Sequence, residues 1–136
     1  MVRIAVDTNV LVRYLTWDDE GKAIEAANAI EEADAVVVPA IVLCELVWVL
    51  KRAYRYTGLE IVNILRRLVA IRALETERPA AEAGIAMLAR GGDFADGVVR
   101  HEADRAKSDR LVTFDQAFAR LLGSEKVVLL GTRAAP

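Results

Sequence analysis

Cysteine and histidine are almost absent from this chain of 136 residues, which contains one of each, Cys44 and His101. A lone cysteine cannot close an internal disulfide, and the two residues together cannot build a zinc site from thiolate and imidazole ligands. Any metal ion would therefore be held by oxygen ligands. Only three prolines are present, and no linker, repeat or low-complexity segment divides the sequence.

Long hydrophobic runs are also absent. The most apolar stretch, residues 41–50, contains a glutamate and is much shorter than the ~18 to 20 residues of a membrane span. An acid at position 7 leaves no room for the apolar part of a secretory signal. We therefore expect a cytoplasmic protein with no membrane partner.

A large net charge is missing too, because 18 basic residues nearly balance 20 acidic ones. This balance excludes a generic high-pI protein that binds polyanions. The composition, 54% hydrophobic and 28% charged, is that of a globular chain. The length predicts a single domain over residues 1–136, with only the last few residues as candidates for disorder.

Five short runs rich in β-branched and apolar residues predict strands, at 2–6, 35–38, 73–75, 111–113 and 127–130. Helix signals lie between them: Asp18 or Asp19 as an N-cap, Thr57 with Glu60 as a capping box, and Pro79 in a first turn. Alternating strands and helices predict an α/β fold, with a five-stranded, mainly parallel sheet and helices on both faces.

Two acids follow predicted strands directly. Asp7 comes after 2–6 and is followed by Asn9, whereas Asp115 comes after 111–113, two residues beyond Thr113. Ligands of open α/β sheets bind at the carboxyl ends of strands, so both carboxylates are candidate ligands. Aspartate is also a favoured helix N-cap, which is an equally good explanation of each residue taken alone.

Glu45 is the only charged residue within 41–50, a helix that is apolar on nearly every side and is therefore expected to be mostly buried. A buried carboxylate is costly unless it is paired, neutralised or bound to a metal. Lys51 or Arg52, further along the helix, could pair with it. Both a salt bridge and a functional role remain open for Glu45.

Asp93 and Asp96 lie on either side of a predicted helix start. Asp93 is better explained as a cap than as a ligand, because acids are favourable at helix N-termini. Asp96 stands one turn further, beside Gly97, which leaves room for an ion or a phosphate. Of the two, Asp96 is the stronger candidate.

Four motifs taken together resemble a family. The segments are Asp7-Thr8-Asn9-Val10-Leu11, Glu45 in its apolar helix, Asp93-Phe94-Ala95-Asp96-Gly97 and Thr113-Phe114-Asp115. In this order they resemble a PIN-domain nuclease, and more narrowly a VapC-type ribonuclease toxin of a toxin-antitoxin module. The resemblance covers the chain to about Gly131 and implies a five-stranded parallel α/β sandwich.

The resemblance implies an acidic tetrad of catalytic and metal-binding residues, Asp7, Glu45, Asp96 and Asp115. Thr113 and Asn9 would support it, and Asp93 would be an additional acid outside the tetrad. Carboxylate-only sites select hard cations, so Mg²⁺ or Mn²⁺ is the expected cofactor. Such ions can activate water for phosphodiester hydrolysis.

A basic segment could bring RNA to this acidic site. Lys51, Arg52 and Arg55 could contact phosphates, and Tyr54 and Tyr56 could stack on bases. The alternative is a solvated helix end, where basic residues are favourable.

The resemblance further implies an RNA substrate, a small antitoxin protein and a homodimer. Tyr14, Leu15 and Trp17 could line the antitoxin groove, although core packing explains them slightly better. Two other functions compete with an endoribonuclease: an inactive PIN-fold module that binds RNA or a partner, and a Mg²⁺-dependent phosphoryl-transfer domain. The second acid that the latter places after its first strand is missing beside Asp7.

Overall fold

The computed structural model describes residues 1–123 and 126–131, and within them the chain forms five strands and seven helices. The strands are β1 (Arg3–Ala5), β2 (Ala35–Val37), β3 (Leu74–Glu75), β4 (Leu111–Thr113) and β5 (Val127–Leu129). The helices are α1 (Thr8–Thr16), α2 (Glu20–Glu32), α3 (Ala40–Arg52), α4 (Gly58–Val69), α5 (Arg78–Ala89), α6 (Phe94–Arg105) and α7 (Gln116–Leu122). The expected disorder of the last few residues concerns a segment outside the described part of the chain.

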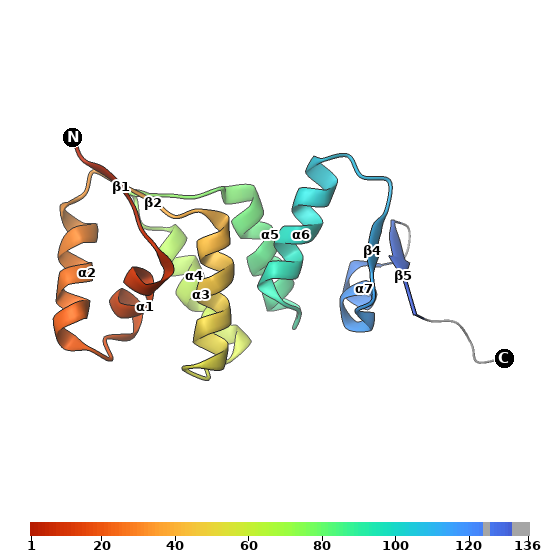
Figure 1. Ribbon diagram of the computed structural model, residues 1–136, viewed down its shortest axis with the longest axis horizontal. Helices are drawn as coiled ribbons and strands as arrows, with labels where there is room; N and C mark the ends of the chain where they lie inside the picture. The colour runs from red at the N-terminus through yellow and green to blue at the C-terminus, as the bar shows by residue number, and fades with distance from the viewer. Residues whose placement is uncertain (124–125, 132–136) are drawn as a thin grey trace.

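The prediction of an α/β fold with five parallel strands is confirmed. Every strand pairing is parallel, β1 with β2, β2 with β3, and β4 with β5. The strands form two sheets rather than one continuous sheet, because β1-β2-β3 and β4-β5 are not joined. The connection after α6 leads away from the first sheet, so β4 and β5 lie at the opposite end of the molecule from β1 (Figure 1).

Helix starts in the first part of the chain follow the capping signals of the sequence. The Asp19 carboxylate accepts a hydrogen bond from the backbone N–H of Lys22 at 3.1 Å. Thr57 and Glu60 form the predicted capping box at the start of α4, and Pro79 lies in the first turn of α5. These local interactions fix where each helix begins.

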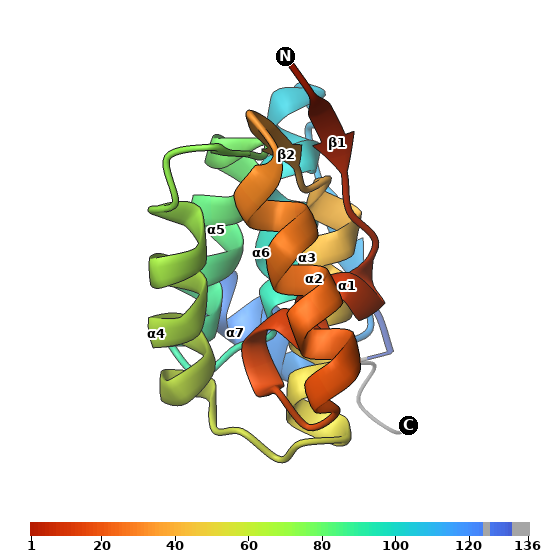
Figure 2. The same ribbon diagram turned by 90° about the vertical axis from the view of Figure 1, so that its left-hand side faces the viewer.

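One hydrophobic core joins the first sheet to helices α1 to α6. Leu11, Leu46, Ile61, Leu65 and Phe94 are fully buried members of this core. Seen from the end that carries β1, α1 and α2 lie in front, with α3, α5 and α6 stacked behind them (Figure 2). We call residues 1–105, which contain this core, the N-terminal body.

Helices α5 and α6 pack unusually closely against each other. A Cβ atom at Gly84 would come within 2.5 Å of the Phe94 ring, and one at Gly97 within 2.4 Å of the Ala83 carbonyl oxygen. Only glycine allows these approaches. The tight packing fixes the N-terminal end of α6, which carries Asp93 and Asp96.

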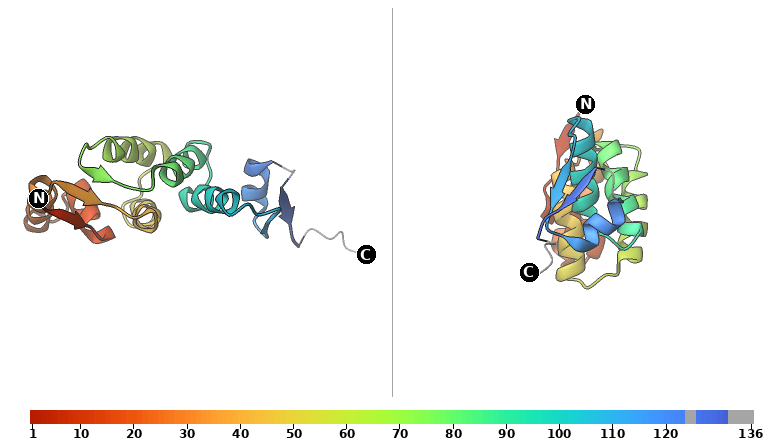
Figure 3. Two further views of the ribbon diagram at one scale, coloured as in Figure 1. Left: turned by 90° about the horizontal axis from the view of Figure 1, so that it is seen from above. Right: turned by 90° about the vertical axis from the view of Figure 1, so that its right-hand side faces the viewer.

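Residues 111–123 and 126–131, with β4, α7 and β5, form a small C-terminal unit. Seen from above, this unit lies beyond α5 and α6, and these helices separate it from the first sheet (Figure 3, left). Arg90, which follows α5, donates a hydrogen bond to the Leu121 carbonyl oxygen at 2.5 Å. A Cβ atom at Gly92 would meet the Leu121 side chain at 2.8 Å, so α7 lies directly against the α5–α6 turn.

None of the helices in the described part of the chain combines the length and the apolar character needed to cross a membrane.

Candidate functional site

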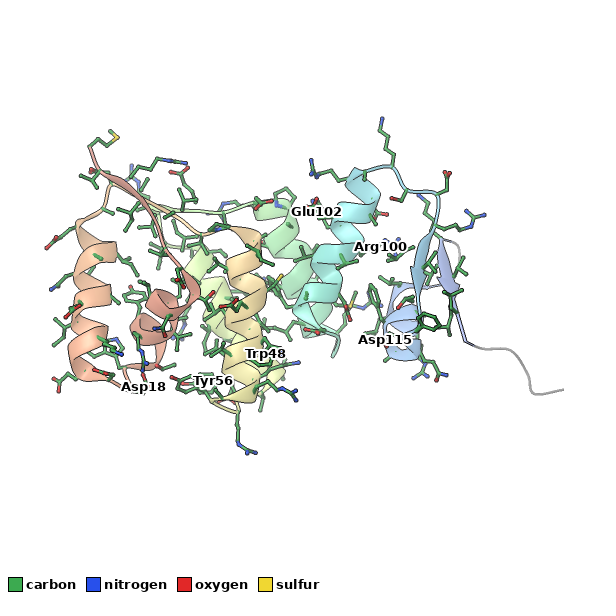
Figure 4. All side chains as sticks on the ribbon, viewed as in Figure 1. Asp18, Trp48, Tyr56, Arg100, Glu102 and Asp115 are labelled. Atoms are coloured by element: carbon green, nitrogen blue, oxygen red, sulfur yellow. The ribbon has the colours of Figure 1, made fainter. Side chains whose placement is uncertain are left out.

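A cleft of 410 Å³ lies where the N-terminal body meets the C-terminal unit. Its acidic side is formed by Asp93 and Asp96 of the α6 start, and by Asp115 at the start of α7. Figure 4 shows Asp115 on the C-terminal unit and Trp48, another residue of the cleft, on α3. The cleft therefore brings together two of the four predicted tetrad residues, Asp96 and Asp115, with the additional acid Asp93.

Asp96 is a partly buried carboxylate of the cleft. Partial burial is the main cause that raises its pKa above the usual aspartate value, and the negative charges of Asp93 and Asp115 raise it further. Both causes disfavour the ionised carboxylate. A cation in the cleft would relieve this crowding of negative charge.

Asp115 is held by its own strand-to-helix turn. Its Oδ1 accepts a hydrogen bond from the Phe118 N–H at 2.9 Å, so the predicted N-cap role is present. The Thr113 hydroxyl accepts a hydrogen bond from the Asp115 N–H at 3.0 Å. The cap uses one oxygen and fixes the side chain, so capping and a functional role are compatible for Asp115.

Asp7 occupies the same kind of turn on the first sheet but faces a different hollow. Its Oδ1 accepts a hydrogen bond from the Asn9 N–H at 3.0 Å at the start of α1. The hollow beside it is also lined by Asn9 and Arg13. The support expected from Asn9 thus comes through its backbone, and Asp7 is not among the residues that line the 410 Å³ cleft.

The expectation that the helix around Glu45 is buried on nearly every side is wrong, because the Glu45 side chain is exposed. It lies on the face of α3 that also carries Ile41 and Trp48, which are 73% and 60% exposed. This face points away from the core side of α3, and for that reason the carboxylate stays in water. Glu45 forms no ion pair with Lys51 or Arg52 in the described structure.

The part of the cleft that α3 contributes is basic and aromatic. Lys51 and Arg52, from the last turn of α3, line the cleft together with Trp48. The Arg52 guanidinium carbon lies 5.6 Å from the centre of the Trp48 ring, which is a cation–π distance. Sequence reasoning missed Trp48. Its position on one helix face with Glu45 and Arg52, three residues after the first and four before the second, was the available signal.

The predicted stacking residues Tyr54 and Tyr56 are engaged elsewhere. The Tyr54 hydroxyl donates to Asp18 Oδ2 at 2.5 Å, and the two rings stack 6.3 Å apart. This hydrogen bond lowers the pKa of Asp18 and raises that of Tyr54. Arg55 lies between the tyrosines, exposed and with a left-handed φ of 58°, and does not line the cleft.

Three further side chains considered for a function, Cys44, Tyr14 and Leu15, pack against the hydrophobic core. Cys44 is half-buried and packs against the core, and its pKa is raised mainly by burial and also by the Asp93 charge. Tyr14 and Leu15 also pack against the core, whereas Trp17 is 50% exposed. Core packing therefore accounts for most of the predicted antitoxin groove.

The acidic donors of the cleft fit a hard cation by their chemistry, because all are carboxylate oxygens. Within residues 1–123 and 126–131, however, no three His, Cys, Asp or Glu side chains lie close enough together to hold an ion. Asp96 and Asp115 would need further ligands to complete a site.

A comparison with protein-family models matches residues 4–122 to the PIN domain. The matched region runs from β1 to the end of α7, so it includes all four predicted tetrad residues and most of the C-terminal unit. No curated protein matches the chain.

Proposed function

Because the chain belongs to the PIN-domain family, a superfamily of metal-dependent nucleases, we propose that it is an endoribonuclease that hydrolyses RNA phosphodiester bonds. The observation that supports this proposal is the cleft that Asp93, Asp96 and Asp115 share with Lys51 and Arg52. An acidic wall can hold cations, and a basic wall can hold phosphates. A nuclease needs both side by side.

Asp96 and Asp115, which share the cleft, would hold the cofactor, Mg²⁺ or Mn²⁺, and Asp7 and Glu45 are the further ligands that the motif order implies. When bound, such an ion lowers the pKa of water and stabilises charge on the phosphate oxygens. Asp96 supports this assignment, because a cation would stabilise its ionised carboxylate, which partial burial and two neighbouring carboxylates disfavour. Asp93 stands next to the set as an additional acid.

Lys51 and Arg52 would bind the phosphates that flank the scissile bond, and the exposed face of Trp48 would stack on an unpaired base. In hydrolysis, the oxygen of one water molecule bonds to phosphorus as one ester P–O bond breaks. The leaving oxygen gains one of the water protons. Arg55, outside the cleft, would bind a more distant phosphate.

The cellular role that fits this activity is the toxin of a type II toxin-antitoxin pair, acting in the cytoplasm as a homodimer and silenced by a small antitoxin. The whole chain would act as one PIN domain. The motif order Asp7, Glu45, Asp96, Asp115 supports the VapC-like assignment. Induced expression should arrest growth, and coexpression of an adjacent small reading frame should relieve the arrest.

The direct test is cleavage of a labelled, unstructured RNA oligonucleotide by protein purified under denaturing conditions and refolded. We expect cleavage with Mg²⁺ and none with EDTA. Asp96→Asn should reduce the rate by at least about 100-fold, because changes to mere outer-shell partners of metal ligands already cost about 10 to 100-fold.

The matched control is Asp109→Asn, which removes the same charge from an exposed residue outside the cleft. It should cleave like the unchanged protein. Equal activity of Asp96→Asn and Asp109→Asn would contradict the proposed site. Cleavage of single-stranded DNA but not of RNA would retain a nuclease and overturn the substrate assignment.

The inactive binding module is the second candidate, since the described carboxylates do not form a complete metal-binding group. It predicts RNA binding without cleavage. In either case the double variant Lys51→Ala/Arg52→Ala should bind RNA more weakly and with a smaller salt dependence. The log–log slope should fall by about one unit for each phosphate that the protein no longer neutralises.

A further inference from the structure

Within the described ranges, each sheet has an outer strand with an unpaired edge, β1 in the first sheet and β4 in the second. Among the described residues, β1 pairs only with β2, and β4 pairs only with β5. An unpaired strand edge is a template for another strand. The strands at these edges also carry or adjoin exposed apolar side chains, with Val2 58%, Val112 53% and Phe114 74% exposed.

The two strands with free edges lead into the same kind of turn. β1 ends at Ala5 and Asp7 caps the next helix; β4 ends at Thr113 and Asp115 caps the next helix. If β4 lay beside β1 in parallel, Ala5 would face Thr113. Asp7 and Asp115 would then emerge at the same sheet edge, one strand spacing of ~4.8 Å apart.

We propose that β4 of a second copy of this chain pairs in parallel with the free edge of β1, and that the two copies exchange their C-terminal units reciprocally. Each dimer would contain two continuous five-stranded sheets. In each, Asp7 of one chain would lie beside Asp115 of the partner. The consequence for catalysis rests on the function proposed above, whereas the exchange itself does not.

The position of the C-terminal unit favours a partner's β4 over the chain's own. Helices α5 and α6 separate the unit from β1 in both side and top views (Figures 1 and 3). The hydrogen bond from Arg90 to Leu121 and the packing of Leu121 against the α5–α6 turn hold it there. Closure within one chain would break these interactions, whereas a second copy can supply β4 without breaking them.

The segment between α6 and β4 has the character of a hinge for such an exchange. Only residues 106–110 connect them, and Lys107 within this segment has a left-handed φ of 57°. A short connection under backbone strain favours exchange of elements between chains. The short connection and the free strand edges therefore both favour exchange between two copies of the chain.

Cysteine crosslinking tests which edges meet. In a Cys44→Ala background, Ala5→Cys and Thr113→Cys would lie on neighbouring strands, within the Cα separation of a disulfide, ~4.4 to 6.8 Å. Oxidised protein should run as a covalent dimer on a non-reducing gel. Ala5→Cys with Arg120→Cys, a residue exposed on α7, is the matched control and should not crosslink.

Two outcomes of the crosslinking experiment would overturn the exchange. A crosslinked monomer would show that β4 reaches β1 within one chain, and no crosslink would show that these edges do not meet. Light scattering of the unsubstituted protein gives an independent measure, because a mass of one chain at high micromolar concentration also contradicts the proposal.

Complementation tests the shared site. Asp7→Asn and Asp115→Asn should each be inactive, but half of the dimers in an equimolar refolded mixture would contain both chains. In those dimers one site has two damaged residues and the other has none, so about a quarter of the original activity should return. No recovery, with the unchanged protein active, would overturn the shared site. If the unchanged protein is inactive, the proposed function fails and the crosslink still decides the exchange.

Discussion

The N-terminal body and the C-terminal unit differ sharply in how much they bury. The body has a continuous core that includes fully buried residues such as Leu46, Leu65 and Phe94. Beyond Phe94, Phe118 is the only buried hydrophobic residue in the described part of the chain. The body can therefore stabilise its own fold, whereas a two-stranded sheet with one short helix is marginal by itself.

Because of this difference, the geometry of the cleft depends on how the C-terminal unit packs against the N-terminal body. Asp96, Lys51 and Arg52 belong to the well-packed N-terminal body, but Asp115 reaches the cleft from the weakly packed unit. A site that spans such a boundary is assembled only when the unit is held in place. The stability of the chain and the integrity of its cleft should therefore respond to different substitutions.

The largest expected effect comes from the core of the body. Leu65→Ala should lower the free energy of unfolding by about 3 kcal/mol, within the range of about 2–5 kcal/mol for buried leucines, because Leu65 is fully buried. Urea denaturation followed by circular dichroism measures this change.

The matched substitution in the C-terminal unit is Val112→Ala, at a residue that is 53% exposed. It should change the free energy of unfolding of the isolated chain by less than about 0.5 kcal/mol. Equal losses at Leu65 and Val112 would break the comparison, because both regions would then be equally packed. A loss at Val112 that appears only when dimers are present would instead support strand exchange.

An intermediate effect is expected at the capping box of α4. Thr57→Ala removes a side-chain acceptor from the Glu60 N–H, 3.2 Å away, and should cost about 1 kcal/mol of unfolding free energy. The control is Asn28→Ala, at an exposed position inside α2, which should be neutral or slightly stabilising. A neutral Thr57→Ala would mean that tertiary packing alone sets the start of α4.

Local features of the fold were predictable from the sequence. Each strand lies within its predicted segment, because β-branched and apolar runs favour extended backbone. The caps Asp7, Asp19 and Asp115 also act as expected, since a cap depends only on the next three residues. Asp93 occupies the N-cap position of α6, but its side chain does not form the expected cap hydrogen bond. These signals are short-range and need no knowledge of the tertiary structure.

Long-range features were not predictable in the same way. The exposure of Glu45 depends on which helices cover α3, and the apolar composition of residues 41–50 does not contain that information. The division into two sheets depends on the direction taken after α6. The sequence order predicts a tetrad, but the structure brings only Asp96 and Asp115 of that set to one cleft.

The smallest effect concerns the acidic wall between the two regions. The pKa of Asp96 is raised in the folded protein above its usual 3.8, first by burial and then by Asp93 and Asp115. The folded state therefore binds the proton more tightly than the unfolded state, and stability falls as pH rises from 3.8 through the raised value. Above the raised pKa, the ionised Asp96 carboxylate destabilises the folded protein by its full amount.

Asp96→Asn removes this cost. In EDTA at about pH 7, the variant should melt at a slightly higher temperature than the unchanged protein, and the difference should vanish in acid below the usual aspartate pKa. Added Mg²⁺ should reverse the order, because ligand binding stabilises only the chain that keeps its carboxylate. Melting curves over pH, with Asp109→Asn as the charge-matched control, measure both effects. A variant that melts lower in EDTA and gains as much from Mg²⁺ would mean that Asp96 does not share a charged site with the C-terminal unit.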